Sequence, residues 1–67
     1  MRTDIYEVLR NNFQSQIERH AMNVRIMMDN PMAIHDHTDY MAGIEEELAL
    51  IAEYRDKLEA LECVGIN

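Results

Sequence analysis

The sequence predicts an all-α fold, an antiparallel two-helix hairpin that self-association completes into a helical bundle. Three observations carry this prediction. Apolar residues recur at gaps of three and four in both halves of the chain, and strict strand alternation occurs nowhere. Asn30-Pro31 separates the halves, because proline lacks an amide proton and pushes the preceding residue away from helical angles. Each half has room for a helix of roughly 25 residues.

The first helix is expected over residues 4–29. Thr3 can cap it, since its hydroxyl can accept from the free amides of the first turn, and Asp4 suits its positive end. Met22 and Ile26 point away from the main apolar stripe, so this helix has a second surface to cover. The predicted stripe is Ile5, Val8, Leu9, Phe13, Ile17, Ala21, Val24, Met27 and Met28.

Residues 30–37 are expected to form the turn and residues 38–64 the second helix, so that residues 1–67 make one domain. One stripe on each helix is used in the hairpin contact, which leaves Leu50 and Tyr54 without a cover. The predicted stripe of this helix is Tyr40, Met41, Ile44, Leu48, Ile51, Tyr54, Leu58 and Leu61.

Two glycines are assigned roles in this helix. Gly43 lies in its first turns, where glycine costs roughly 1 kcal/mol relative to alanine, so we expect it to allow close approach of another backbone. Gly65 is expected in the left-handed conformation of a Schellman cap, which would bring Leu61 against Ile66.

Charge is distributed unevenly. Residues 1–30 carry four arginines and four acids, whereas residues 31–67 carry nine acids against Arg55 and Lys57, which accounts for the formal net charge of -7. A chain with this charge and no clustered basic face lacks the main driving force for binding phosphate. We therefore expect neither nucleic acid nor an anionic membrane as a partner.

Small size makes a partner subunit the expected source of stability. A core of this size rarely supplies more than ~3–5 kcal/mol, and Cys63 is the only cysteine, so no disulfide can form within the chain. The sequence has no signal-peptide pattern and no apolar run near the ~20 residues of a membrane span. We expect a cytoplasmic homo-oligomer.

No catalytic, cofactor or metal site is predicted. His35, Asp36, His37, Asp39 and His20 have the residue types of a metal site, but the His-x-His spacing falls in a loop or helix start and suits a strand better. These residues are interpreted as a polar connection with helix caps. His20 is interpreted as a hydrogen-bonded residue at the boundary of the core.

The acids of the second helix are interpreted as a solvated face and not as a magnesium site. Glu45, Glu46 and Glu47 point about 100° apart on a helix, so they cannot converge on one ion. Glu53 with Lys57 is expected to pair at i,i+4, as is Arg55 with Glu59. Cys63 has no base near it in the sequence. The predicted partner-binding residues are Glu45, Glu46, Glu53, Asp56, Met22, Ile26 and Leu50.

Residues 30–62 resemble small acidic helical proteins encoded by large tailed bacteriophages, including phages of marine bacteria. The resemblance rests on Asn30-Pro31-Met32-Ala33-Ile34, on His37 and Asp39, and on the acidic stretch 44–59. It implies a phage-encoded virion, assembly or accessory protein that acts through a host or virion protein. It assigns no functional residues.

The sequence therefore predicts a non-enzymatic protein–protein interaction module with a coiled-coil-like hairpin. The alternative is an acidic inhibitor or nucleic-acid mimic whose outer face occupies a basic groove on a host protein. A mimic needs carboxylates over a broad face, whereas these acids cover one side of one helix.

Overall fold

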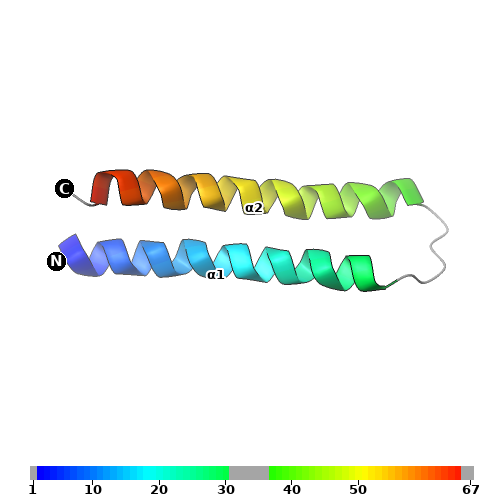
Figure 1. The fold of residues 1–67 in the computed structure, drawn as a ribbon, viewed down its shortest axis with the longest axis horizontal. Coiled ribbons are helices and arrows are strands. Elements are labelled where there is room, and N and C mark those ends of the chain that lie inside the picture. The colour runs from blue at the N-terminus through cyan, green and yellow to red at the C-terminus, as the bar shows by residue number, and fades with distance from the viewer. Residues whose placement is uncertain (1, 31–36, 66–67) are drawn as a thin grey trace.

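The computed structural model describes residues 2–30 and 37–65, and these form two helices, α1 (Arg2–Asp29) and α2 (His37–Gly65). The helices run antiparallel along each other, so the start of α1 and the end of α2 lie at the same end of the molecule (Figure 1). The predicted hairpin is confirmed, and α1 ends at Asp29 as the Asn30-Pro31 pair requires. It begins at Arg2, so Thr3 lies inside its first turn and is not its cap.

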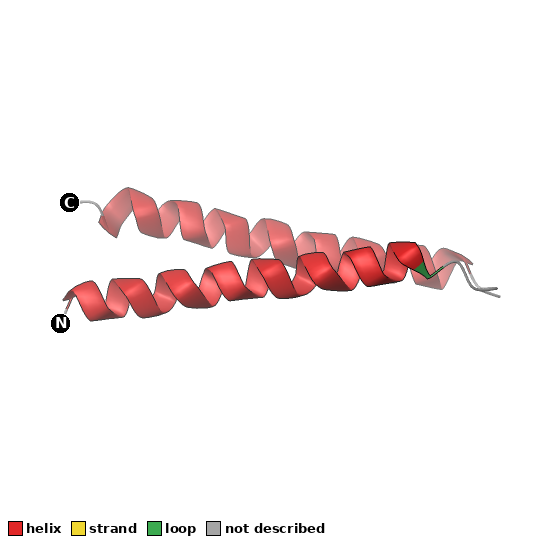
Figure 2. Cartoon of the chain, turned by 60° about the horizontal axis from the view of Figure 1, so that its bottom comes forward, coloured by secondary structure: helices red, strands yellow, loops and turns green. Residues whose placement is uncertain are grey.

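The helices cross at a shallow angle and meet along a seam of residues with a seven-residue repeat (Figure 2). Alternating gaps of three and four average 3.5 residues, which is the spacing that keeps one helix against another in a coiled coil. All seam residues except Arg10 are buried or half-buried. On α1 they are Tyr6, Arg10, Phe13, Ile17, His20, Val24 and Met27, and on α2 Tyr40, Ile44, Glu47, Ile51, Tyr54, Leu58, Leu61 and Gly65.

The predicted apolar stripes are wrong at six positions, which the structure leaves exposed. These residues are Ile5, Val8, Leu9, Met28, Met41 and Leu48. Neighbouring residues on a helix point about 100° apart, so Met28, Met41 and Leu48, each of which directly follows a seam residue, turn away from the contact. Seam residues stay at the contact because the gaps between them alternate between three and four residues. The seam therefore includes polar residues such as Arg10, which a search for apolar residues does not find.

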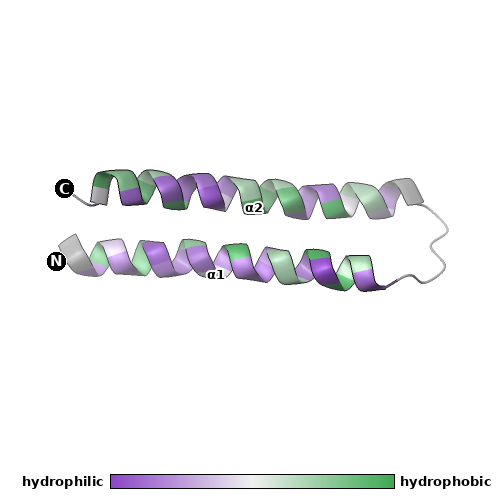
Figure 3. Ribbon diagram, viewed as in Figure 1, coloured by the Kyte–Doolittle hydropathy of each residue, from purple (hydrophilic) through white to green (hydrophobic). Residues whose placement is uncertain are grey.

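The core of the hairpin is small. Among the described side chains, Val24 alone is buried, at 7% exposure, and none is fully enclosed. Green apolar and purple polar segments alternate along both helices (Figure 3). The pair of helices therefore leaves much of its apolar surface uncovered.

Both glycines make room for side chains of α1. The methyl carbon of Met27 lies 3.2 Å from where a Gly43 Cβ would stand, so a side chain and not another backbone approaches this glycine. The ring of Tyr6 occupies the corresponding position on Gly65. Gly65 belongs to α2 and no described residue has a positive φ, so the predicted left-handed cap is wrong. Ile66, its expected contact, lies outside the described residues.

Tyr40 ties the start of α2 to the end of α1. Its hydroxyl donates a hydrogen bond to the carbonyl oxygen of Met27 and lies 3.5 Å from that of Asn30. The last carbonyls of a helix have no partner within it, so this hydroxyl satisfies one that α1 leaves free. The contact holds the two helices together at the turn end.

Candidate functional site

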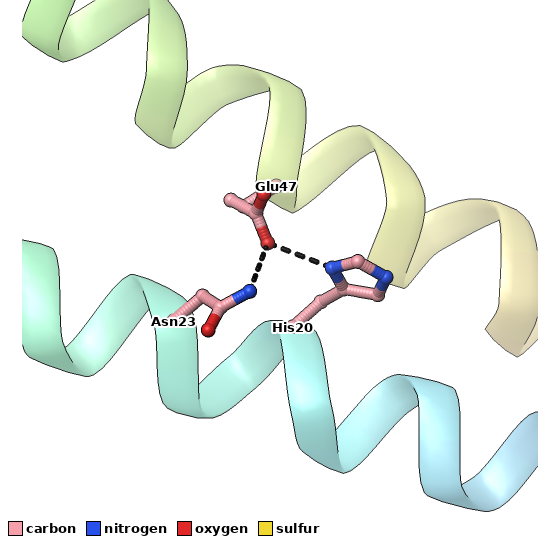
Figure 4. Close-up of polar contacts among 3 residues, drawn as sticks. All are labelled: His20, Asn23 and Glu47. Atoms are coloured by element: carbon pink, nitrogen blue, oxygen red, sulfur yellow. Dashed lines mark hydrogen bonds and ion pairs between the residues drawn. The ribbon is translucent and has the colours of Figure 1, made fainter.

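A cluster of three polar side chains lies at the middle of the seam. His20 Nδ1 is 2.7 Å from Glu47 Oε1, and Asn23 Nδ2 donates to the same oxygen over 3.0 Å (Figure 4). The side chains of His20 and Glu47 are 13% and 22% exposed, so the pair is largely shielded by the helices. His20 is therefore a hydrogen-bonded residue at the helix contact, as predicted from its place in the sequence.

The carboxylate of Glu47 is held in its charged form. Its pKa is lowered from the ordinary glutamate value of 4.5, first by the hydrogen bond from Asn23 and then by that from His20, while desolvation opposes the shift. An ionised carboxylate can only accept, so the His20 Nδ1 facing it carries the proton. Glu47 departs here from its neighbours Glu45 and Glu46, which are exposed.

The ring of Tyr54 lies beside this cluster. Tyr54 stacks on the His20 imidazole with centroids 6.1 Å apart and planes 9° apart, and it contacts Phe13 at a centroid distance of 6.2 Å. Lys57 Nζ lies 5.2 Å from the centre of the Tyr54 ring, within cation–π range. Tyr54 lies in the seam, in agreement with its place in the predicted stripe, so the further expectation that it would lack a cover is wrong.

The cluster does not resemble a catalytic or metal centre. A carboxylate with two donors on one oxygen and a lowered pKa is a weak base, and Cys63 is exposed on α2. The described residues contain no group of three or more potential ligands placed to hold a metal ion. His35 and Asp36 lie outside the described residues, and of His37 the structure describes the helical backbone alone.

The predicted acidic residues are exposed on α2. Glu45, Glu46, Glu53 and Asp56 all reach solvent. Glu53 accepts an i,i+4 hydrogen bond of 3.1 Å from Lys57, as predicted. The expected pair of Arg55 with Glu59 does not form in the described structure. Arg10 and Glu62 instead approach each other to 4.0 Å between the helices, an exposed contact that contributes little to stability.

The predicted apolar binding residues divide into two groups. Met22 and Ile26 are exposed, at 55% and 59%, as expected from their position off the stripe. Leu50 is half-buried, so the hairpin itself covers part of it and the expectation that it would lack a cover is wrong. Ile5 and Val64 are also exposed, and the sequence analysis did not predict this. The seven-residue repeat is the signal that places both residues outside the seam.

A shallow groove of about 590 Å³ lies between the helices on the side of Gln14 and Arg55. Ile17 and Leu58 form part of its lining, and three acids, Asp56, Glu59 and Glu62, border it. One arginine against three carboxylates gives this side a negative balance. The groove therefore suits a basic side chain better than an anionic ligand.

No protein-family model, curated protein or solved structure matches this chain. Neither α1 nor α2, over the residues that the structure describes, is both long and apolar enough to cross a membrane.

Proposed function

We propose that this chain is a non-enzymatic protein–protein interaction module whose first partner is another copy of itself. One observation carries the proposal. The described hairpin buries Val24 alone and exposes nine large apolar side chains. The burial of apolar surface has to offset the conformational entropy that the chain loses on folding. A hairpin with so small a core buries too little apolar surface to do this well by itself. Association supplies that burial.

The proposed setting is the cytoplasm of a bacterial host cell, or a virion. This part of the proposal rests on the resemblance of residues 30–62 to acidic helical proteins of large tailed phages. The role would be that of a small structural, assembly or accessory protein. Its exposed apolar residues would serve self-assembly, while its exposed acids would remain outermost.

The mass of the purified protein in solution tests the proposal. We expect light scattering at micromolar concentration to give a multiple of the 7.9 kDa chain mass, because the exposed apolar residues are covered by association. The mass should fall toward that of the single chain on dilution, together with the helical signal. A folded species of 7.9 kDa at all concentrations would contradict self-association.

A second candidate function is inhibition of a basic host protein by the acidic residues of α2. Their exposure favours it, since Glu45, Glu46, Glu53 and Asp56 lie on the outside of the hairpin. The Lys57–Glu53 pair weighs against it because it neutralises one of the four. If no basic protein binds them, these acidic residues of α2 would serve to keep the protein soluble.

Salt dependence separates these two roles of the acidic residues. If they bind a basic protein, its association rate should fall as salt rises from about 0.05 to 0.5 M, because screening shortens the reach of the field. Glu46→Gln with Glu53→Gln should weaken binding and leave self-association intact. Glu7→Gln with Glu18→Gln on α1 is the control for net charge alone. Equal binding by both double variants would reject the acidic face as the binding site.

A further inference from the structure

The far side of α1 carries a second seven-residue repeat. Every residue of this repeat after Ile5 lies two positions beyond a seam residue, as Val8 does after Tyr6, and two positions turn about 200° around a helix. The repeat therefore faces away from α2, and all of its members are exposed. We call it the outer seam, and it consists of Ile5, Val8, Asn12, Ser15, Arg19, Met22 and Ile26.

The far side of α2 has a different composition. The residues two positions after its seam residues Tyr40 to Leu61 are all exposed, and they include three acids and no apolar side chain larger than cysteine. They are Ala42, Glu46, Ala49, Glu53, Asp56, Ala60 and Cys63. The outer seam of α1, in contrast, has no acid and holds four of the nine large apolar side chains that the described hairpin exposes. The far side of α2 therefore suits water, whereas that of α1 suits another protein surface.

The outer seam is symmetric about its middle residue, Ser15. Ile5 and Ile26 stand at its two ends, and Val8 and Met22 come next toward the middle. In an antiparallel pair of outer seams with a two-fold axis at Ser15, Ile5 of one copy would face Ile26 of the other, and Val8 would face Met22. Each apolar residue of the outer seam would therefore meet an apolar residue.

The charged residues in and beside the outer seam fit the same antiparallel pairing. Asp4 directly precedes Ile5 and Arg25 directly precedes Ile26, so Asp4 of one copy and Arg25 of the other lie on the same flank of the contact. Opposite charges would then face each other at both ends of the pair. In a parallel pair Asp4, Arg19 and Arg25 would each face the same residue of the other copy, and like charges repel.

We propose that two copies of the chain pair through the outer seams of α1, antiparallel, about a two-fold axis at Ser15. The inference rests on the proposed self-association and specifies its surface and orientation. The two α1 helices form the middle of the dimer and the two α2 helices lie outside. α1 carries four arginines and four acids, whereas α2 carries eight acids against Arg55 and Lys57, so this arrangement keeps the acidic helices apart.

The far side of α2 in another copy fits the outer seam less well. It would offer carboxylates to Arg19, but it would set Ile5, Met22 and Ile26 against alanines and acids, which cover little apolar surface. That contact is also head-to-tail, so each copy would keep a free surface for the next one. It therefore predicts masses above that of a dimer.

A matched pair of charged variants tests the surface. Ile26→Glu changes the outer seam, whereas Met28→Glu changes a residue outside it, and the two wild-type side chains are 59% and 62% exposed. We expect light scattering to give about 16 kDa for the wild type and for Met28→Glu, and 7.9 kDa for Ile26→Glu. A dimeric Ile26→Glu or a monomeric Met28→Glu would overturn the outer seam and leave self-association standing. A wild-type mass of 7.9 kDa would remove both proposals, and one well above 16 kDa would overturn the two-fold pairing.

Cross-linking tests the orientation even if Ile26→Glu fails to fold. In a Cys63→Ser background, Val8→Cys and Met22→Cys are made as separate proteins, which are oxidised alone or after unfolding and refolding together. The antiparallel dimer should give a disulfide-linked species of about 16 kDa from the mixture and little from either protein alone. Cross-linking of each protein with itself would indicate parallel copies and overturn the inference. No cross-link in any sample, from a wild type that is dimeric, would also overturn it.

Discussion

Val24→Asp is expected to abolish the folded hairpin, because it places a charge at the one buried position of the described core. Burial of an uncompensated carboxylate costs several kcal/mol, and a core of this size rarely supplies more than ~3–5 kcal/mol. Far-ultraviolet circular dichroism at neutral pH should show loss of most helix. The thermal transition should no longer be cooperative.

Met28→Asp is the matched control for Val24→Asp. It adds the same charge to the same helix, one turn nearer the C-terminal end of α1, at a residue that is 62% exposed. We expect its helical signal and thermal midpoint to stay within the small range of surface substitutions, about 0.5 kcal/mol. If both variants unfolded equally, added charge on α1 and not the burial of Val24 would be the cause.

Glu47→Gln is expected to lower the thermal midpoint at neutral pH. The variant keeps an oxygen that can accept from His20 and Asn23 but loses the charge that strengthens both bonds. Because folding lowers the pKa of Glu47 below 4.5, its ionised form stabilises the fold above that pH. This contribution is lost as the pH falls through the lowered pKa of the folded state.

The difference in thermal midpoint between wild type and Glu47→Gln should therefore be largest near neutrality and shrink as the pH falls below 4.5. Glu46→Gln provides the control, since Glu46 is the exposed neighbour of Glu47 on the same helix. It should show little difference at any pH. A difference for Glu47→Gln that is constant from neutral to acid pH would contradict the role of its charge.

The polar cluster also has a role in the alignment of the helices. Polar residues in a coiled-coil seam lower stability, but they specify register, since any shift leaves the half-buried carboxylate of Glu47 without donors. One step of seven residues along either helix would set Glu47 away from both His20 and Asn23. The apolar seam residues alone discriminate less between registers, because each can pack against several apolar neighbours of similar size.

The sequence by itself determined the secondary structure and its break. Both helices, the end of α1 at Asp29 and the Lys57–Glu53 pair follow from interactions between residues at most four apart. Propensity, proline geometry and i,i+4 pairing are local, so they can be read without knowing what lies across the hairpin. The exposure of Met22 and Ile26 was predictable for the same reason, from their angle around one helix.

The tertiary structure decided which residues meet. His20 and Glu47 are 27 residues apart, and the ring of Tyr6 covers Gly65 from the opposite end of the chain. Such contacts depend on the register and crossing of two helices, and a shift along either helix would exchange every partner. Local patterns specify neither quantity, which is why they predict a left-handed cap at Gly65 where the structure has a helical residue under the ring of Tyr6. Side-chain packing across the seam sets both the register and the crossing of the helices. In this short hairpin the exposed apolar residues are about as numerous as those in the seam, so hydrophobicity alone does not select which of them meet.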